Sequence, residues 1–214
     1  MRAAVLALTL SAATAASVSA QGRVEISGGA IVAGGVDFGK RNADLTTNST
    51  APGVTVLFTT NSSIEPAIGV QGRLGFAVTS SLAIEGGLRF TRPVYKIRAT
   101  GDFENAPDVN AEETFNDYVF DGSAVWHFGD APRARMVPFV FGGAGYVRAL
   151  HDGSSSLEDG VEYHAGGGIK WWLGSGSHVG IRADGGVSIR EREFDLESKS
   201  RLTPIASASV IWRF

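Results

Sequence analysis

Apolar and polar residues alternate along most of the chain, which is typical of strands that bury only one face. The alternation is clearest over residues 179–189, where the odd positions are apolar or glycine and the even positions include Arg182, Asp184 and Ser188. Successive side chains of a strand point to opposite faces, so this segment has one apolar and one charged face. Similar alternation predicts seven further strands, at residues 24–38, 68–78, 82–90, 114–128, 137–147, 161–173 and 206–214.

The connections between these segments alternate in length. Short connections at residues 79–81, 129–135 and 174–177 follow every second strand, and the others are longer and polar, at residues 39–65, 100–113, 151–160 and 191–201. An even strand number with short turns on one side and long loops on the other is typical of outer-membrane barrels. We therefore predict an all-β fold, an eight-stranded antiparallel up-and-down transmembrane β-barrel, with its short turns and both ends in the periplasm.

Aromatic residues give an independent indication. On the apolar parity they gather at the strand ends that this topology places at the periplasmic interface, where membrane barrels carry an aromatic girdle. The core of a soluble β-sandwich is the alternative explanation. The predicted membrane-interface aromatics are Phe76, Trp126, Phe128, Phe139, Trp171, Trp212 and Phe214.

The polar parity carries about as many acids as bases, which suits a small closed interior. Eight strands enclose a space that side chains alone can fill, and an unpaired buried charge costs several kcal/mol. We therefore expect a structural ion-pair network in the lumen. Asp117 and Asp121 lie about 13 Å apart along a strand that rises about 3.3 Å per residue, so pairing with arginine is a simpler interpretation than a catalytic dyad. The network is predicted to comprise Arg73, Glu85, Arg89, Asp117, Asp121, Glu162, Lys170, Arg182, Asp184 and Arg190.

The first twenty residues have the pattern of a secretory signal peptide. Arg2 precedes an uncharged stretch over residues 3–16, and Val18-Ser19-Ala20 ends it with small residues of the type that signal peptidase reads. We expect residues 1–20 to be removed and residues 21–214 to form the barrel domain. A membrane-anchoring helix is the alternative for the first segment. Beyond residue 21 no apolar run reaches the length of a transmembrane helix.

Composition narrows the functional classes. The chain has no cysteine, which excludes disulfides and thiolate chemistry, and its net charge of -3 argues against nucleic-acid binding. Glycine accounts for 28 of 214 residues, nearly twice the usual share of roughly 7 %. Runs at residues 142–143, 166–168 and 185–186 are expected to permit curvature and to make room for bulky neighbours.

Three segments resemble those of small OmpA/OmpX-like outer-membrane β-barrel proteins: residues 138–146, 164–170 and 210–214. The last resembles the C-terminal signal that the barrel-assembly machinery reads, with Val210, Trp212 and Phe214 alternating up to a terminal phenylalanine. The resemblance implies a monomer in the bacterial outer membrane, surrounded by outer-membrane lipid and lipopolysaccharide. It also implies the assembly machinery as a partner during biogenesis.

Some eight-stranded barrels modify lipid A, so catalytic residues need consideration. The deacylases of that class use a His-x-Ser pair, whereas each of the four histidines here is followed two positions later by glycine. We predict no enzymatic activity and no catalytic, cofactor-binding or metal-binding residue. His127, His164 and His178 share the polar parity, but structural hydrogen bonding is a simpler interpretation than a metal site. The same holds for residues 152–159, where an ordinary solvated loop is simpler than a calcium site.

The long loops are the remaining candidates for function. Residues 39–65 are rich in Thr, Asn and Ser, and residues 100–113 are acidic. Long loops on a rigid scaffold are where binding usually resides. We predict a non-enzymatic integral outer-membrane protein with a filled lumen, which supports the envelope or binds partners through its loops. A lipid-modifying barrel enzyme and a soluble, secreted, lipocalin-like ligand binder stay open as alternatives.

Overall fold

The computed structural model describes residues 24–45, 55–104, 106–129, 134–151, 157–174, 177–191 and 201–214. These residues form eleven strands. Among them there is no helix with the length and apolar character needed to span a membrane. The predicted signal peptide lies outside the described residues, as does most of the loop considered for calcium, including Asp152.

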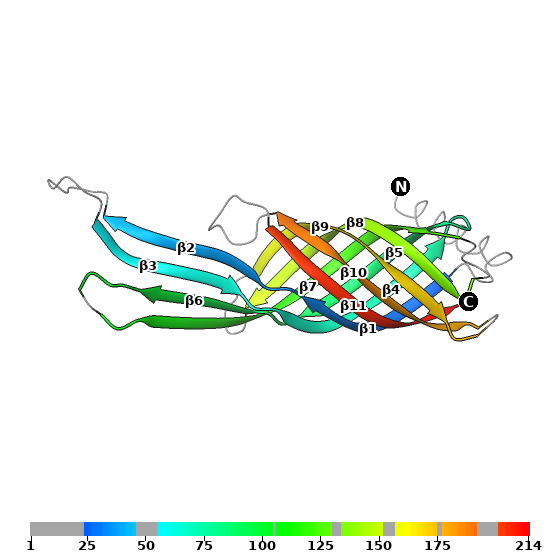
Figure 1. The fold of residues 1–214 in the computed structure, drawn as a ribbon, viewed down its shortest axis with the longest axis horizontal. Helices are drawn as coiled ribbons and strands as arrows, with labels where there is room; N and C mark the ends of the chain where they lie inside the picture. The colour runs from blue at the N-terminus through cyan, green and yellow to red at the C-terminus, as the bar shows by residue number, and fades with distance from the viewer. Residues whose placement is uncertain are drawn as a thin grey trace, which may run out of the picture.

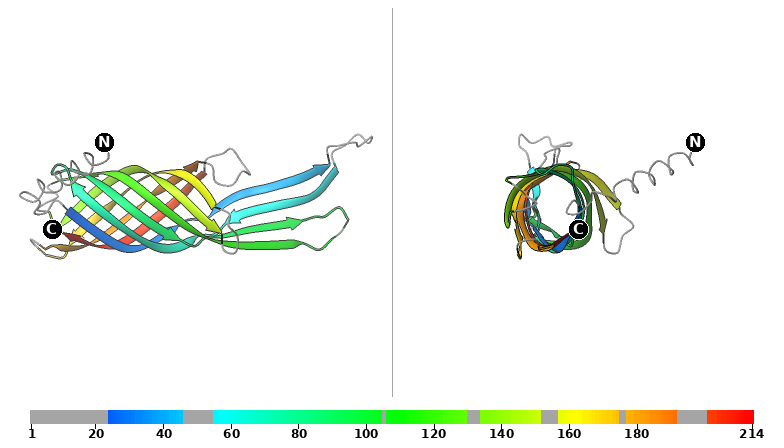
Figure 2. Two further views of the ribbon diagram at one scale, coloured as in Figure 1. Left: turned by 180° about the vertical axis from the view of Figure 1, so that it is seen from behind. Right: turned by 90° about the vertical axis from the view of Figure 1, so that its right-hand side faces the viewer.

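Eight strands close into an antiparallel barrel, as predicted. In spatial order, β1 is followed by β4, β5, β7, β8, β9, β10 and β11, and β11 pairs back with β1. Figures 1 and 2 show the barrel from the side and from its end, with the strands strongly tilted. The barrel strands are β1 (Val24–Ala33), β4 (Ala67–Ala77), β5 (Leu82–Thr91), β7 (Val109–His127), β8 (Met136–His151), β9 (Leu157–Trp172), β10 (Val179–Glu191) and β11 (Arg201–Arg213).

The other three strands, β2 (Val36–Leu45), β3 (Thr55–Ile64) and β6 (Val94–Thr100), lie beyond one end of the barrel. With the first residues of β7 they form a four-stranded sheet in the order β2-β3-β6-β7. We call this sheet the outer extension: residues 36–45, 55–64, 94–100 and 109–114. The prediction that residues 39–65 and 100–113 are loops is therefore wrong for much of both segments. Strands β2 and β3 carry many polar residues and lack the sustained alternation by which the barrel strands were recognised, but backbone pairing still holds them in the sheet. Strand β6 does alternate, with Tyr95, Ile97 and Ala99 on one face, but it was not among the predicted strands.

The apolar face of the barrel points outward, and the charged face points inward. Ile68 is 76 % exposed and Trp212 51 %, whereas Arg182 and Lys170 are each 1 % exposed and Glu162 0 %. A soluble ligand-binding barrel has the opposite arrangement, greasy inside and polar outside. The lipocalin-like alternative is therefore wrong, and the exposed apolar wall is suited to hydrocarbon.

The prediction that Phe139, on strand β8, is a membrane-interface aromatic is wrong. Its ring points into the lumen and is only 2 % exposed, whereas Met136 and Val140 face outward at 54 % and 45 %. Residues 136–141 are apolar at nearly every position, so alternation did not determine which parity faces the lipid. The glycines of β9 favour the observed choice, because a Cβ atom added at Gly168 would lie 2.7 Å from the Phe139 ring. Glycine here makes room for phenylalanine.

The other six predicted interface aromatics all lie on the outer surface, near the barrel end opposite the extension. Each is about half exposed, and most stand where a strand reaches a short turn. Their contact with the membrane interface stays a prediction. They are Phe76, Trp126, Phe128, Trp171, Trp212 and Phe214.

Candidate functional site

Glu85 is the centre of one group of charges in the lumen, near the short turns. Arg182 donates from Nη1 to both carboxylate oxygens of Glu85, at 2.9 and 2.7 Å. The Nε of Arg182 donates to Asp184 at 2.9 Å. Lys170 lies 3.5 Å from Glu85 and also pairs with Glu25. We call these five residues the turn-end cluster.

Glu162 is the centre of a second group, closer to the extension. It pairs with Arg89 and accepts a hydrogen bond from the Nε of Arg190 at 2.8 Å. Arg190 also donates to Asp117 at 2.6 Å, and Arg89 donates to Asp121 at 3.2 Å. We call these five residues the outer cluster. Arg73 lies between the two groups, with Nη1 3.5 Å from Asp121.

All ten predicted lumen residues therefore lie inside the barrel: four belong to the turn-end cluster together with Glu25, five form the outer cluster, and Arg73 lies between the two. Asp117 and Asp121 have separate arginine partners: Asp121 lies beside Arg89 and Arg73, whereas Asp117 lies beside Arg190 on a strand far away in sequence. The spacing of the two aspartates along β7 gave their separation. That spacing did not predict which arginine each aspartate pairs with, because side chains from strands that are not neighbours in the sheet meet inside the barrel.

Inward aromatic rings cover the turn-end cluster, and the sequence analysis missed this contact. The guanidinium of Arg182 lies 4.5 Å from the centre of the Phe139 ring, and the ammonium of Lys170 lies 5.7 Å from it. Nearby, Arg213 lies 4.1 Å from the Trp172 ring. A cation over an aromatic face is attracted by the ring quadrupole. Rings and charges together thus fill the barrel near the short turns.

Ser123 and His164 form a contact that could be mistaken for a catalytic pair. The Oγ of Ser123 lies 2.7 Å from Nε2 of His164, and Nδ1 of His164 lies 4.0 Å from Glu162. A serine, a base and an acid in this order are the components of an activated nucleophile. Both side chains are buried, at 4 % and 5 % exposure, inside a lumen packed with ion pairs. The side chains that bury the pair separate it from the outward apolar wall of the barrel.

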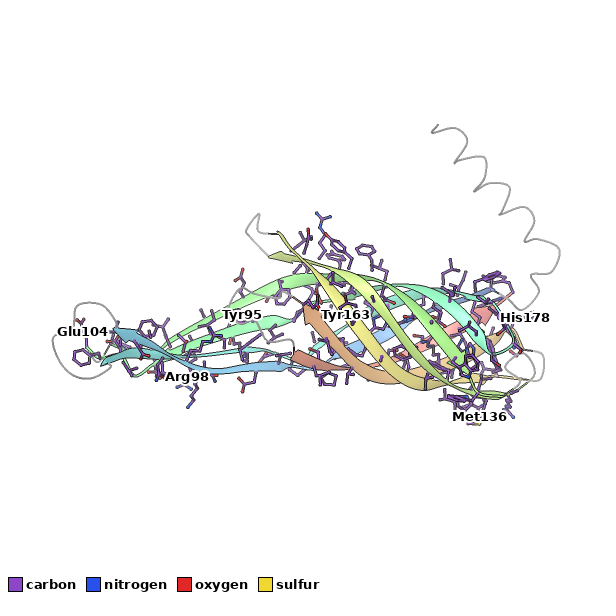
Figure 3. The ribbon with its side chains drawn as sticks, turned by 90° about the horizontal axis from the view of Figure 1, so that it is seen from above. Tyr95, Arg98, Glu104, Met136, Tyr163 and His178 are labelled. Atoms are coloured by element: carbon purple, nitrogen blue, oxygen red, sulfur yellow. The ribbon has the colours of Figure 1, made fainter. Side chains whose placement is uncertain are left out.

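The histidines do not converge on a metal. Within the described residues, no group of three or more His, Asp or Glu side chains is arranged to hold an ion. His178 lies at the turn end of the barrel (Figure 3), where its Nδ1 is 2.9 Å from the Arg213 carbonyl oxygen. Toward the other end, a cavity of about 20 Å³ is lined in part by Arg89, Asp117 and Arg190. That volume holds about one water molecule, which leaves no room for a larger solute.

The outer extension has an apolar inner face where it leaves the barrel. Tyr95 and Phe115 are buried there, at 7 % and 1 % exposure, and Phe38, Ile64 and Ile97 pack against them. Beside this cluster the exposed Lys96 lies 2.7 Å from Glu65 and 3.1 Å from Glu112. The hydrogen bonds that the Lys96 ammonium donates to these two carboxylates raise the pKa of Lys96. The lysine thus links the chain entering β4 to strand β7.

The far end of the extension holds a small cleft, which we call the tip cleft. It has a volume of about 160 Å³. The turn after β6 closes it by bonding to β3, because the amide of Phe103 donates to the Leu57 carbonyl oxygen at 2.8 Å. Figure 3 marks this end of the molecule with Arg98 and Glu104. The cleft is lined by Phe58, Ala99, Thr100, Asp102, Ala106, Pro107, Asp108 and Val109.

No protein-family model matches the chain, and no curated protein matches it. Several solved structures share its fold. Neisserial surface protein A is 15 % identical with a TM-score of 0.53, over 89 % of this chain and 97 % of that one. OprG of Pseudomonas aeruginosa is 10 % identical with a TM-score of 0.56, over 91 % and 96 %.

The attachment invasion locus protein Ail of Yersinia pestis, solved with the heparin analogue sucrose octasulfate, is 14 % identical. Its TM-score is 0.50, and the match covers 91 % of this chain and 99 % of that one. Identities this low speak for the fold alone. At that level the predicted resemblance is confirmed: the chain has the fold of the small, eight-stranded OmpA/OmpX-like outer-membrane barrels.

Proposed function

We propose that this protein is a non-enzymatic surface-binding protein of the bacterial outer membrane, in which a filled barrel holds the outer extension above the membrane. The observation that carries the proposal is the contrast between the two parts of the molecule. The lumen is occupied by paired charges and rings, whereas the extension presents side chains and a cleft to the surroundings. Rigid scaffolds that carry exposed segments usually bind through those segments.

Outer-membrane insertion is supported by the outward apolar wall and by the fold of the similar structures. In this proposal residues 1–20 are removed during export, so that the mature chain begins at Gln21. Outer-membrane lipid and lipopolysaccharide surround the barrel, and the assembly machinery reads Val210, Trp212 and Phe214. Mass spectrometry of the protein purified from outer membranes tests the cleavage, since retention of residues 1–20 contradicts it.

Surface binding is favoured over envelope support alone by the size of the extension, which a purely structural barrel does not need. Four strands project beyond the barrel end, and near its mouth Lys96 links β6 to β7 and to the chain that enters β4. Among the similar structures, one is named a surface protein and another an attachment protein. Those names describe other proteins, and they agree with the role proposed here.

A lipid-modifying enzyme is the second candidate, because Ser123 and His164 are in hydrogen-bond contact. Its difficulty is access, since both residues lie inside the packed lumen. Mass spectrometry of lipid A from cells with and without the protein separates the two candidates. A changed lipid A species that disappears in Ser123→Ala cells would establish the enzyme.

The direct test removes part of the extension and keeps the barrel. Residues 37–63 are replaced by a short Asn-Gly turn, and adhesion of expressing bacteria to fibronectin, laminin, heparin and protamine coatings is compared with that of the full chain. We expect adhesion to at least one coating to fall to the level of cells lacking the protein, while heat-modifiable gel mobility shows a folded barrel. Equal adhesion of both strains to all four coatings contradicts surface binding by this hairpin.

A further inference from the structure

The tip cleft differs from the other surfaces of the extension in combining an apolar hollow with a rim of acids. Its walls come from two hairpins, with Phe58 on β3 and Val109 on β7. The strand register places them on one face, because Ala99 of β6 stands opposite both Thr60 of β3 and Val109. The cleft is therefore built by the pairing of three strands and is not a gap within one loop.

The volume of the tip cleft limits the size of its occupant. About 160 Å³ is close to the volume of a cavity that accepts one benzene-sized molecule, which is roughly 150 Å³. Phe58 is 36 % exposed and Val109 62 % exposed, so both present apolar surface for a ring to cover. One six-membered ring fills this space, and any larger part of a ligand would extend out of the cleft.

The rim determines the charge of the occupant. Asp102 and Asp108 both line the cleft. Asp108 pairs with Arg98 at 3.0 Å, but that carboxylate side chain stays 46 % exposed. Asp102 uses Oδ1 to accept from the amides of Glu104 and Ala106. The two lining carboxylates and Glu104 outnumber Arg98, and the neighbouring strand β2 adds one base, Arg41, and one acid, Asp44; acids therefore remain in excess around the cleft, which favours a cation over an anion.

We propose that the tip cleft binds a small organic cation that carries one six-membered ring, of the arylalkylammonium type. The ring lies between Phe58 and Val109, and the ammonium group lies at the carboxylates of Asp102 and Asp108. This inference rests on the proposed function and names a ligand class for the extension. The face of Phe58 can also attract the ammonium group, which adds to the preference for a cation.

Phenethylammonium is the probe, with phenethyl alcohol and hydrocinnamate as its neutral and anionic counterparts on the same two-carbon tether. Binding to the full-length protein in lipid nanodiscs is measured by saturation-transfer NMR, with empty nanodiscs as the reference for partition into lipid. We expect saturable binding of phenethylammonium in the millimolar range, which is typical of a site that holds one ring. Hydrocinnamate is expected to bind at least about fivefold more weakly, and 0.5 M salt is expected to reduce the difference.

Three variants locate the site. Phe58→Ala is expected to weaken phenethylammonium binding about tenfold, because it removes one wall. The pair Asp102→Asn and Asp108→Asn is expected to weaken it about two- to thirtyfold, since two exposed ion pairs are lost and each contributes about 0.2–1 kcal/mol. Asparagine at position 102 keeps the oxygen that the turn needs. Val56→Ala is the matched control, because Val56 is an exposed apolar residue of the same strand that does not line the cleft.

The outcomes separate this inference from the proposed function. Equal affinity of the wild-type protein and Phe58→Ala, or equal affinity for the ammonium and carboxylate probes, overturns the cleft assignment. If the probe fails to bind while removal of residues 37–63 lowers adhesion, the ligand class is wrong and the binding role of the extension stands. If the probe binds as expected and that removal leaves adhesion unchanged, the cleft assignment stands and the adhesion role fails.

Discussion

Arg182 is the residue whose loss tests most directly whether the lumen is held by ion pairs. Its guanidinium makes two hydrogen bonds to Glu85 and one to Asp184, and all three side chains are at most 5 % exposed. Removal of one member of a buried pair typically costs 3–5 kcal/mol, because the partner stays behind without compensation. Lys170 remains 3.5 Å from Glu85 and offsets part of that loss. We therefore expect Arg182→Met to destabilise the barrel by about 3 kcal/mol.

Urea unfolding in micelles, followed by tryptophan fluorescence, measures this change. With a denaturant dependence of roughly 2 kcal/mol/M, a loss of about 3 kcal/mol lowers the midpoint by about 1.5 M. The control is Arg98→Met, which breaks a pair of similar length, 3.0 Å, whose side chains are 62 % and 46 % exposed. Exposed pairs contribute about 0–1 kcal/mol, so this midpoint should shift by no more than about 0.5 M.

A second variant keeps the interpretation testable if Arg182→Met assembles poorly. Combining Arg182→Met with Glu85→Gln removes the stranded carboxylate, so we expect the double variant to be more stable than the sum of the two single changes by at least about 1 kcal/mol. Equal midpoints for Arg182→Met and Arg98→Met, together with additive single effects, would refute the reasoning. They would mean that water in the lumen screens these charges as bulk solvent does.

Three further predictions concern the wall and the extension. Gly168→Ala places a methyl group 2.4 Å from a backbone carbonyl oxygen of β10, so we expect it to lower the free energy of unfolding by about 1–3 kcal/mol. At Gly122 an added Cβ atom has nothing within 4 Å, and Gly122→Ala should change that free energy by less than about 0.5 kcal/mol. Similar urea midpoints for the two variants contradict this prediction. Leu88→Arg places a charge near the middle of the outward wall, where a membrane barrel loses about 2–4 kcal/mol, and an unchanged midpoint in lipid vesicles argues against the proposed membrane face. Because the pKa of Lys96 is raised above the ordinary 10.5, its link to two glutamates is complete below that pH and is lost as the pH rises through the raised value; an NMR titration midpoint at or below 10.5 contradicts the link.

The barrel could be predicted from the sequence because lipid and lumen impose opposite demands on neighbouring residues. Where a strand has one large apolar parity and one charged parity, as around Ile181 and Arg182, the direction of both faces follows at once. Strand β8 lacks that contrast near Phe139, and its direction depends on the glycines of β9 that receive the ring. Such a contact joins two strands, so the local pattern of either strand alone does not contain it.

The partners within the lumen were only partly predictable for a related reason. Which residues belong to the lumen network follows from the alternation along each strand, and all ten residues predicted to lie in the lumen do lie there. The pairing of Asp117 with Arg190, or of Arg182 with Glu85, depends on which side chains meet across the barrel axis. That geometry is set by tilt and by the register of strands that do not touch in the sheet. Sequence spacing therefore gives the composition of the network and not its connections.

The outer extension is the largest part of the fold that the sequence analysis did not predict, and the reason for this is relevant to function. Hairpins outside the membrane have no lipid-facing parity, so β2 and β3 carry many polar residues without sustained alternation, and most of their residues were predicted to form a loop. The same freedom permits Phe58, Val109 and two aspartates to surround a cleft, an arrangement that the barrel wall does not allow, because its outward positions must suit hydrocarbon. Among the described residues, its inward positions are filled largely by charges that pair with one another, and the cavity beside Arg89, Asp117 and Arg190 holds only about 20 Å³. Binding chemistry is thus restricted to the part of the chain on which the membrane imposes no pattern.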